Sequence, residues 1–260
     1  MSSIIVWPGG KHYLADWIVE HFPPHKTYVE PFGGAAHVLL AKPPSKTEVY
    51  NDYSEDLVNL FWVVKHQPQH LMAALDVLPY SRAIKARIEH EWKEGFKGAT
   101  PVERAARFFY LVNAAFAGRM FGGFGFGRQR NHARAFFSKV ARIKQISERL
   151  KNVMIDCVDW RLCIERYDSP DTLFYCDPPY ANSVVYSHAE GSNWGLEEMR
   201  ELADVLNQIE GKAVVSHYRT PEVDALFKGW RKESREVCLY LRKTKGEARD
   251  KRIEGLYMNF

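Results

Sequence analysis

Long apolar segments are missing from this sequence. None of its 260 residues lies in an apolar run of about 18 residues, the length that a helix needs to cross a bilayer. The N-terminal residues MSSIIVWPGGKHYLADW also lack a basic stretch followed by an apolar core, so they do not resemble a secretory signal. We therefore expect a cytoplasmic protein with no membrane span and no leader.

Cysteine is scarce as well. No two of the four cysteines have Cys-x-x-Cys spacing, and histidines do not flank them at intervals typical of zinc ligands. This excludes a disulfide-rich scaffold and predicts free thiols in a reducing compartment, without a structural metal. The cysteines are Cys157, Cys163, Cys176 and Cys238.

Acidic residues are few in one third of the chain. Residues 81–152 contain 16 Lys and Arg but 5 Asp and Glu, a net charge of +11, whereas the remainder has 20 against 27. Such an asymmetry is typical of a protein with a polyanionic partner. A solvated basic helical face is the alternative, and charge alone does not decide between the two.

Hydrophobic periodicity divides the chain into two kinds of segment. The first 65 residues alternate strand and helix, which is typical of a parallel sheet, and strands return after residue 152. We predict an α/β sheet domain of residues 1–66 and 153–260, split by a mainly helical, basic insertion of residues 67–152. The expected strands are 28–29, 47–52, 153–157, 172–176, 213–217 and 236–241, and the expected helices 35–41, 54–65, 69–78, 81–94, 101–117, 138–150 and 196–208.

Three short motifs follow predicted strands, and ligands collect at the carboxyl ends of strands in an open parallel sheet. They are Glu30-Pro31-Phe32-Gly33-Gly34, Asn51-Asp52 and Asp177-Pro178-Pro179-Tyr180. The glycines allow close ligand approach, or form a plain turn. The Asp52 carboxylate suits the two hydroxyls of a ribose, but it also suits a cap for the helix that starts near Ser54.

The Asp-Pro-Pro-Tyr motif is the most informative of the three. Two prolines remove two N–H donors and fix two φ angles, and Asp177 is biased toward an extended conformation. The Asp177 carboxylate and the Pro178 carbonyl then form an edge rich in acceptors, followed by the flat ring of Tyr180. This combination suits a planar ligand with an amino group, although a turn that only ends the strand is the alternative.

The order of the motifs resembles the Dam-type (class alpha) adenine-N6-specific DNA methyltransferases. It runs from Trp-x-Gly-Gly-Lys at 7–11, through the three motifs above and the helical insertion, to EGLYMNF at 254–260. The resemblance implies a Rossmann-like fold that binds S-adenosylmethionine, with the insertion as its target-recognition domain. The chain departs from the family at Ala36, where a glycine is common, and no stretch of the insertion aligns with the hairpin that reads GATC.

The same resemblance implies roles for individual residues. Asp177 and the Pro178 carbonyl would each accept one hydrogen of the adenine amino group, and Tyr180 would stack on the adenine after it flips out of the duplex. Asp159 would bind the cofactor's adenine or, alternatively, cap a helix at 160–166. The implied catalytic residues are Asp177, Pro178, Pro179 and Tyr180, and the implied cofactor-binding residues are Trp7, Gly10, Lys11, Glu30, Pro31, Phe32, Gly34, Asp52, Asp159 and Asp177.

The segment AGRMFGGFGFGRQRNHAR at 117–134 is the main candidate for DNA contact. Arginine pairs bidentately with guanine, and Asn or Gln with adenine. The candidate residues are Arg119, Arg128, Gln129, Arg130, Asn131 and Arg134. The string GGFGFG lacks the strand–helix context of a nucleotide-binding loop, and a flexible basic loop without sequence preference is the alternative.

We therefore expect a site-specific DNA adenine methyltransferase, a monomer that acts on duplex DNA and belongs to the kind of enzyme found in restriction–modification. Two alternatives remain: an RNA adenine-N6 methyltransferase, and a nucleic-acid-binding homologue without activity. Asp rather than Ser before Pro-Pro disfavours methylation of cytosine N4.

Overall fold

The computed structural model describes residues 1–180, 194–238 and 251–260 and divides the chain into two compact units. The first unit contains residues 1–16, 34–43 and 52–157, and the second contains residues 17–33, 44–51 and 158–260. The chain therefore passes repeatedly from one unit to the other, once at Gly34, shortly after β1, and once at Asp52, directly after β2.

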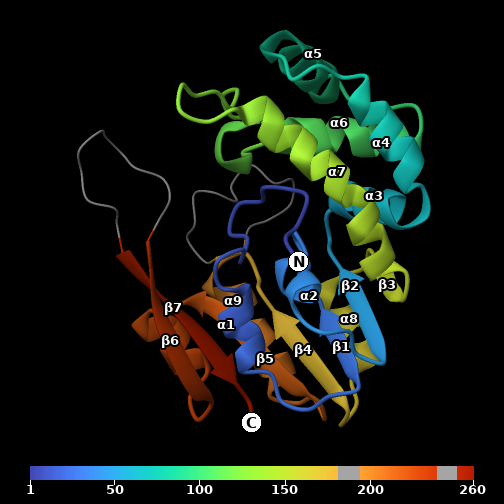
Figure 1. Cartoon of the computed structure of the whole chain (residues 1–260). Helices are drawn as coiled ribbons and strands as arrows, with labels where there is room; N and C mark the ends of the chain where they lie inside the picture. Colours follow the sequence, from blue (N-terminus) through green and yellow to red (C-terminus); the bar gives the residue numbers. More distant parts are fainter. Residues whose placement is uncertain (181–193, 239–250) are drawn as a thin grey trace. The chain divides into compact units, whose positions relative to one another are not determined.

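The second unit is built on a sheet in which the strand order is β2-β1-β4-β5-β7-β6 (Figure 1). The first four of these strands are parallel, while β7 is antiparallel to both β5 and β6. The strands are β1 (Thr27–Glu30), β2 (Thr47–Asn51), β4 (Thr172–Cys176), β5 (Lys212–Tyr218), β6 (Arg231–Cys238) and β7 (Lys251–Met258).

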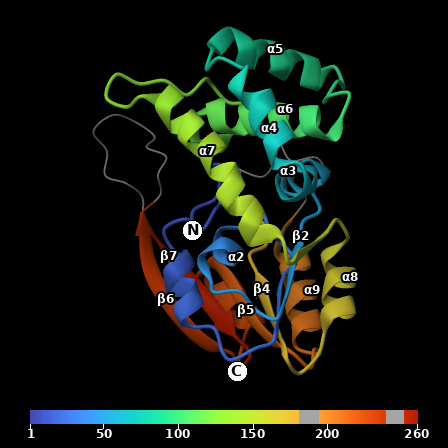
Figure 2. The same cartoon turned by 45° about the vertical axis from the view of Figure 1, so that its right-hand side comes forward.

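Helices cover one face of this sheet (Figure 2). Alternate strand residues such as Val29, Phe174 and Val215 are fully buried against apolar side chains of α8, α9 and α10. Burial of this kind contributes about 25 cal/mol per Å² of apolar surface removed from water. The helices are α8 (Trp160–Tyr167), α9 (Leu196–Leu206) and α10 (Pro221–Leu226), and α1 (Ala15–Glu20) begins in the first unit and ends in the second.

The first unit is mainly helical, and α6 lies at its centre. Nearly every residue of this helix from Ala105 to Ala114 is buried, because α3, α4 and α5 all pack against it. Arg107 is nevertheless paired, since its guanidinium contacts Glu91 at 2.5 Å. The elements are α2 (His37–Ala41), α3 (Glu55–His66), α4 (Pro68–Asp76), α5 (Arg82–Lys93), α6 (Pro101–Ala114), η1 (Phe116–Gly118), α7 (His132–Leu150) and β3 (Val153–Asp156).

The α/β class predicted from the sequence is confirmed, and several element ends differ from the prediction. The helix expected over 101–117 ends at Ala114, and a separate 3-10 turn follows. The helix expected from residue 138 begins at His132, because Asn131 caps it. The strand expected over 236–241 already begins at Arg231, and residues 239–241 lie outside the described part of the chain. The boundaries of a catalytic domain and a recognition insertion stay a prediction.

None of the helices in the described residues is both long and apolar enough to cross a membrane.

Candidate active site

The carboxyl ends of three parallel strands, β1, β2 and β4, lie side by side and form one edge of the second unit's sheet. Val29 of β1 is in register with Val49 of β2 and with Phe174 of β4, and all three strands are parallel. The residues that follow these strands therefore emerge side by side, as predicted from the sheet pattern. Within this unit, the edge carries the turn after Glu30, the side chain of Asn51 and the Asp177 motif.

Asp177 is held by an oriented chain of hydroxyls. The Ser216 hydroxyl donates to Asp177 Oδ1 over 2.9 Å, and the Tyr175 hydroxyl lies 2.9 Å from the Ser216 oxygen. Because Ser216 has one hydrogen and gives it to Asp177, Tyr175 must donate to Ser216. Tyr175 and Ser216 are both buried, so this chain fixes the orientation of the half-buried Asp177 carboxylate.

The residues after Asp177 are packed into the second unit. Pro178 is buried and Pro179 is half-buried. The Tyr180 ring is 6% exposed, lies 4.4 Å from the Tyr218 ring centre, and donates its hydroxyl to buried Glu254 of β7. Burial, and then the negative charge of Glu254, raises the pKa of Tyr180 well above its usual value, so its hydroxyl remains protonated and acts as a donor. Tyr180 thus ties the proline corner to the last strand.

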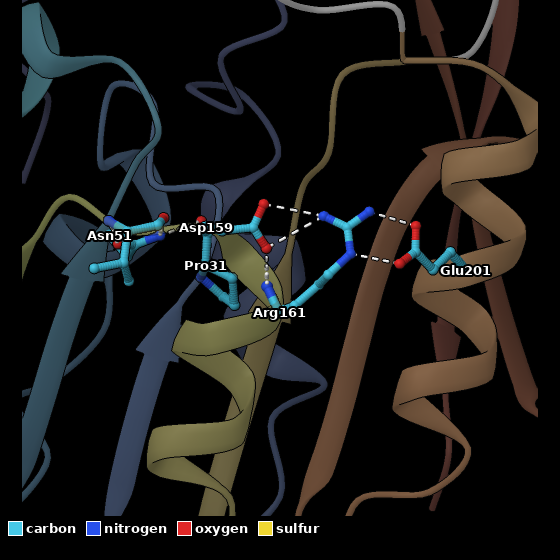
Figure 3. A network of polar contacts seen from close by, with 6 residues as sticks. Pro31, Asn51, Asp159, Arg161 and Glu201 are labelled. Atoms are coloured by element: carbon cyan, nitrogen blue, oxygen red, sulfur yellow. Dashed lines mark hydrogen bonds and ion pairs between the residues drawn. The ribbon is translucent and has the colours of Figure 1, made fainter.

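Asn51 joins three loops at this edge (Figure 3). Its fully buried side chain donates to the carbonyls of Pro31 and Val158, both over 3.0 Å, and accepts from the Val158 amide over 2.9 Å. Its own carbonyl also accepts from the Gly33 amide over 2.7 Å. One amide side chain therefore fixes the segments that carry Phe32 and Asp159.

Asp159 caps α8 and takes part in an ion-pair network (Figure 3). Its Oδ1 accepts from the Arg161 amide over 2.8 Å, and the Arg161 guanidinium contacts its carboxylate at 3.0 Å. The same guanidinium pairs with Glu201 of α9, and this pairing raises the pKa of Arg161 above its usual value. The capping alternative for Asp159 is therefore observed, and its cofactor role stays a prediction.

Aromatic side chains line the turn after β1. Phe32 lies 5.2 Å from Trp194 and 6.0 Å from Trp160, measured between ring centres. The buried Trp194 Nε1 has no hydrogen-bond acceptor among the described residues. A buried N–H is unfavourable unless a water, a ligand or a residue outside the described part of the chain accepts from it. Glu30, at the end of β1, is itself buried and accepts from the Tyr28 hydroxyl over 2.7 Å.

Asp52 belongs to the first unit and is held by backbone amides. Its Oδ2 accepts from Gly34 N and its Oδ1 from Ser54 N, both over 2.8 Å. Burial raises the pKa of Asp52 above its usual value, and these two hydrogen bonds offset part of that increase. In the described part of the chain no cation pairs with it, so the carboxylate keeps lone pairs for other donors. Gly34 has a φ of +47°, a conformation that favours glycine.

The Trp-x-Gly-Gly-Lys motif is also in the first unit. The Trp7 ring packs 5.9 Å from Phe108, and a Cβ at Gly34 would lie 3.4 Å from Trp7 Cδ1. Gly10 donates to the Trp7 carbonyl over 3.0 Å, and the buried Lys11 donates to the Gly9 carbonyl over 3.0 Å. Trp7 thus lies next to Gly34, whose amide donates to Asp52, and the cofactor role of these residues stays a prediction.

Several contacts join the basic segment to the rest of the first unit. Ala115 and Phe124 form an antiparallel bridge, and the Tyr80 hydroxyl donates to the Gly125 carbonyl over 2.6 Å. The Arg82 guanidinium lies 5.0 Å from the ring centre of Phe126, which is 70% exposed. Every predicted DNA-contacting residue in this segment is exposed: Arg119, Arg128, Gln129, Arg130, Asn131 and Arg134. Asn131 also caps α7 by accepting from Arg134 N.

The sequence did not point to Ser216, Tyr175 or the clamp made by Asn51. Ser216 is 39 residues from Asp177, and Val158 is 107 residues from Asn51, so only the folded chain brings each pair together. The polar Ser216 within the apolar strand AVVSH was the one local signal.

Comparison with known proteins gives a consistent result. The family model described as D12 class N6 adenine-specific DNA methyltransferase matches residues 7–238. The chain is 30% identical to a DNA adenine methylase of Haemophilus influenzae over 226 residues, which cover 81% of this chain and 76% of that protein. It is 24% identical to a DNA adenine methylase of Vibrio cholerae over 242 residues, covering 87% and 85% of the two chains. It is also 28% identical to the type II methyltransferase M.MjaIII of Methanocaldococcus jannaschii over 204 residues, covering 69% of each.

Proposed function

The chain belongs to the D12 class N6 adenine-specific DNA methyltransferase family, and from this premise we propose that it transfers a methyl group from S-adenosylmethionine to adenine N6 at specific DNA sites. The family predicted from the order of the motifs is thereby confirmed. The main support for the proposed catalytic residues is the fixed orientation of Asp177. Asp177 lies at the carboxyl end of β4, beside the carboxyl ends of β1 and β2.

Asp177 and the Pro178 carbonyl act on the amino group of the target. The adenine amino group is a weak nucleophile because its lone pair is delocalised into the ring. Two acceptors, one for each N–H, favour the pyramidal nitrogen in which that lone pair becomes available. Groups that are fixed before reaction lose little energy to reorganisation, and this is usually the largest contribution to catalysis. Ser216 and Tyr175 supply that fixation for Asp177.

The described residues fit S-adenosylmethionine. The buried, unpartnered Trp194 Nε1 next to Phe32 and Trp160 suits an aromatic ligand that carries an acceptor. Asp52 keeps acceptor capacity for two ribose hydroxyls. When bound, the cofactor supplies an activated methyl group on a sulfonium. The residues proposed to hold it are Trp7, Gly10, Lys11, Glu30, Pro31, Phe32, Gly34, Asp52, Asp159 and Asp177.

We assign DNA recognition to the basic loop at 117–134. Its exposed arginines and amide side chains are of the types that read base edges and hold phosphates. The target adenine must leave the duplex, at a cost of roughly a few kcal/mol. Tyr180 is buried in the structure, so stacking on that adenine requires its ring to be uncovered when DNA binds.

The free thiols of Cys157, Cys163 and Cys176 support a reducing, cytoplasmic location.

One assay tests this proposal. The protein is incubated with labelled S-adenosylmethionine and either unmodified genomic DNA or ribosomal RNA, and 6-methyladenine is then mapped. We expect label in DNA at one short recurring sequence. Label in RNA alone would replace the DNA proposal with the RNA alternative, and label in neither substrate would contradict the enzymatic function.

A further inference from the structure

Two cations of α7, Lys139 and Arg142, form a pair, the α7 cation pair, that has no role in the proposed function. Lys139 and Arg142 are three residues apart on this helix, so they lie on the same face, and both are half-buried. Lys139 Nζ donates to Asn113 Oδ1 of α6 over 2.5 Å. Asn113 is itself fixed, because its amide donates to the Ile4 carbonyl over 3.1 Å.

The α7 cation pair has no negative counter-charge among the described residues. In the described part of the chain, Arg142 makes no hydrogen bond or ion pair, and Lys139 is bonded to a neutral amide. Burial, and then the positive charges of Arg142 and Arg130, lower the pKa of Lys139 to about 8. Burying cations without a counter-charge is unfavourable. The fold therefore maintains a positive site that a bound anion would stabilise.

Further cations of the same unit lie near the α7 cation pair, as the pKa of His37 shows. Burial lowers the pKa of His37 to about 3, and the charges of His12, Lys11, Lys139 and Arg142 act in the same direction. His37 is consequently neutral at physiological pH and can donate or accept one hydrogen bond. The ring of His12 lies 5.5 Å from it.

We propose that Lys139 and Arg142 form a subsite for a phosphodiester group of the bound DNA strand. The proposal rests on the proposed function and adds residues outside the loop at 117–134. Its link to that loop is Arg130, whose charge acts on Lys139 and which is itself a predicted DNA contact. The planar guanidinium of Arg142 suits bidentate contact with two phosphate oxygens, while Lys139 acts as a point charge.

The salt dependence of DNA binding tests the subsite. Equilibrium binding of a duplex oligonucleotide is measured over a range of salt concentrations for Lys139→Met, Arg142→Gln and the double variant. The double variant loses the single phosphate contact and should reduce the slope of log affinity against log salt by about 0.9, and each single variant should reduce it by part of that amount. Lys144→Met is the matched control, because Lys144 is an exposed cation on the same helix. Its slope should equal that of the wild type.

The wild-type protein provides a second test that needs no variant. Since the pKa of Lys139 is about 8 in the free protein, raising the pH from 7 to 9 removes its proton and should weaken DNA binding. The groups that bond to Lys139 or act on its charge are Asn113, Arg130, Arg142 and His37, and His37, with a pKa of about 3, stays neutral from pH 7 to 9. Lys139→Met should abolish this part of the pH dependence.

The outcomes separate the two proposals. Wild-type protein that fails to bind any DNA would contradict the proposed function and the subsite together. Wild-type binding with an unchanged slope in the double variant, or without weakening between pH 7 and 9, would overturn the subsite alone. Weaker binding of S-adenosylmethionine by these variants in the absence of DNA would assign the α7 cation pair to the cofactor's carboxylate and also overturn the subsite.

Discussion

Ser216 and Asp177 are joined by a hydrogen bond between neighbouring strands of one sheet. Ser216 lies in β5, Asp177 follows β4, and the hydroxyl donates to the carboxylate over 2.9 Å. Because Tyr175 donates to Ser216 in turn, the chain of donors has one direction. The carboxylate proposed to act on adenine is therefore positioned by two side chains that do not themselves reach the substrate.

Ser216→Ala should lower kcat without weakening cofactor binding. A hydrogen bond to a charged group contributes about 1.5–3 kcal/mol, which corresponds to a roughly tenfold to hundredfold loss in rate. Tyr175→Phe leaves the Ser216 donor in place and should cost less. Single-turnover methylation gives the rate, and calorimetric titration gives the affinity for S-adenosylmethionine.

Ser147→Ala is the control for this prediction. Ser147 is also buried, but it lies in the first unit and bonds the Lys65 carbonyl. This variant should keep the wild-type rate. A Ser216→Ala protein with unchanged kcat, or with a loss confined to cofactor affinity, would show that the hydroxyl does not position Asp177.

Asn51→Ala should destabilise the protein strongly. The substitution removes three hydrogen bonds and leaves the buried Pro31 carbonyl and the half-buried Val158 amide and carbonyl without these partners, which we expect to cost about 2–4 kcal/mol of unfolding free energy. Asn59→Ala, which removes one exposed hydrogen bond to the Pro101 carbonyl, should cost less than about 1 kcal/mol. Urea denaturation measures both, and equal losses would argue against the clamp.

Two alanines with positive φ should respond differently to replacement by glycine. Ala36 and Ala117 both have a φ of 55°, a conformation that costs a residue with a Cβ about 1–2 kcal/mol. Ala117 is exposed, so Ala117→Gly should stabilise the protein by about 0.5–1 kcal/mol. Ala36 is fully buried, and losing its methyl costs about 0.8 kcal/mol, so Ala36→Gly should be nearly neutral. Thermal unfolding that ranks the two variants in the opposite order would refute this.

The sequence predicted most of what depends on local pattern and strand order. The Asp177 motif and the turn after Glu30 were placed at strand ends, because alternating elements imply a parallel sheet with a common edge. The beginning of β6 was missed, because the charged residues from Arg231 to Glu236 resemble an exposed loop more than an edge strand. The start of α7 was missed because Asn131, which caps it, was interpreted as part of the loop.

The contacts that hold the site in place could not be predicted from the sequence, for a different reason. Asn51 bonds Val158 across 107 residues, and Tyr180 bonds Glu254 across 74, so neither pairing has a signature within a sequence window. The proposed ligand-binding residues occur in short motifs that can be recognised in the sequence. The residues that hold them in place are determined by tertiary packing.

The most direct test of the account is Asp177→Asn. The variant keeps the shape of the side chain and an oxygen that can accept from Ser216, but it presents an N–H where the adenine amino group needs an acceptor. We expect the single-turnover rate of methyl transfer to DNA to fall by at least about a hundredfold, while S-adenosylmethionine binds with nearly wild-type affinity. Near-normal methyl transfer by this variant would contradict the assignment of Asp177 as the group that activates adenine N6.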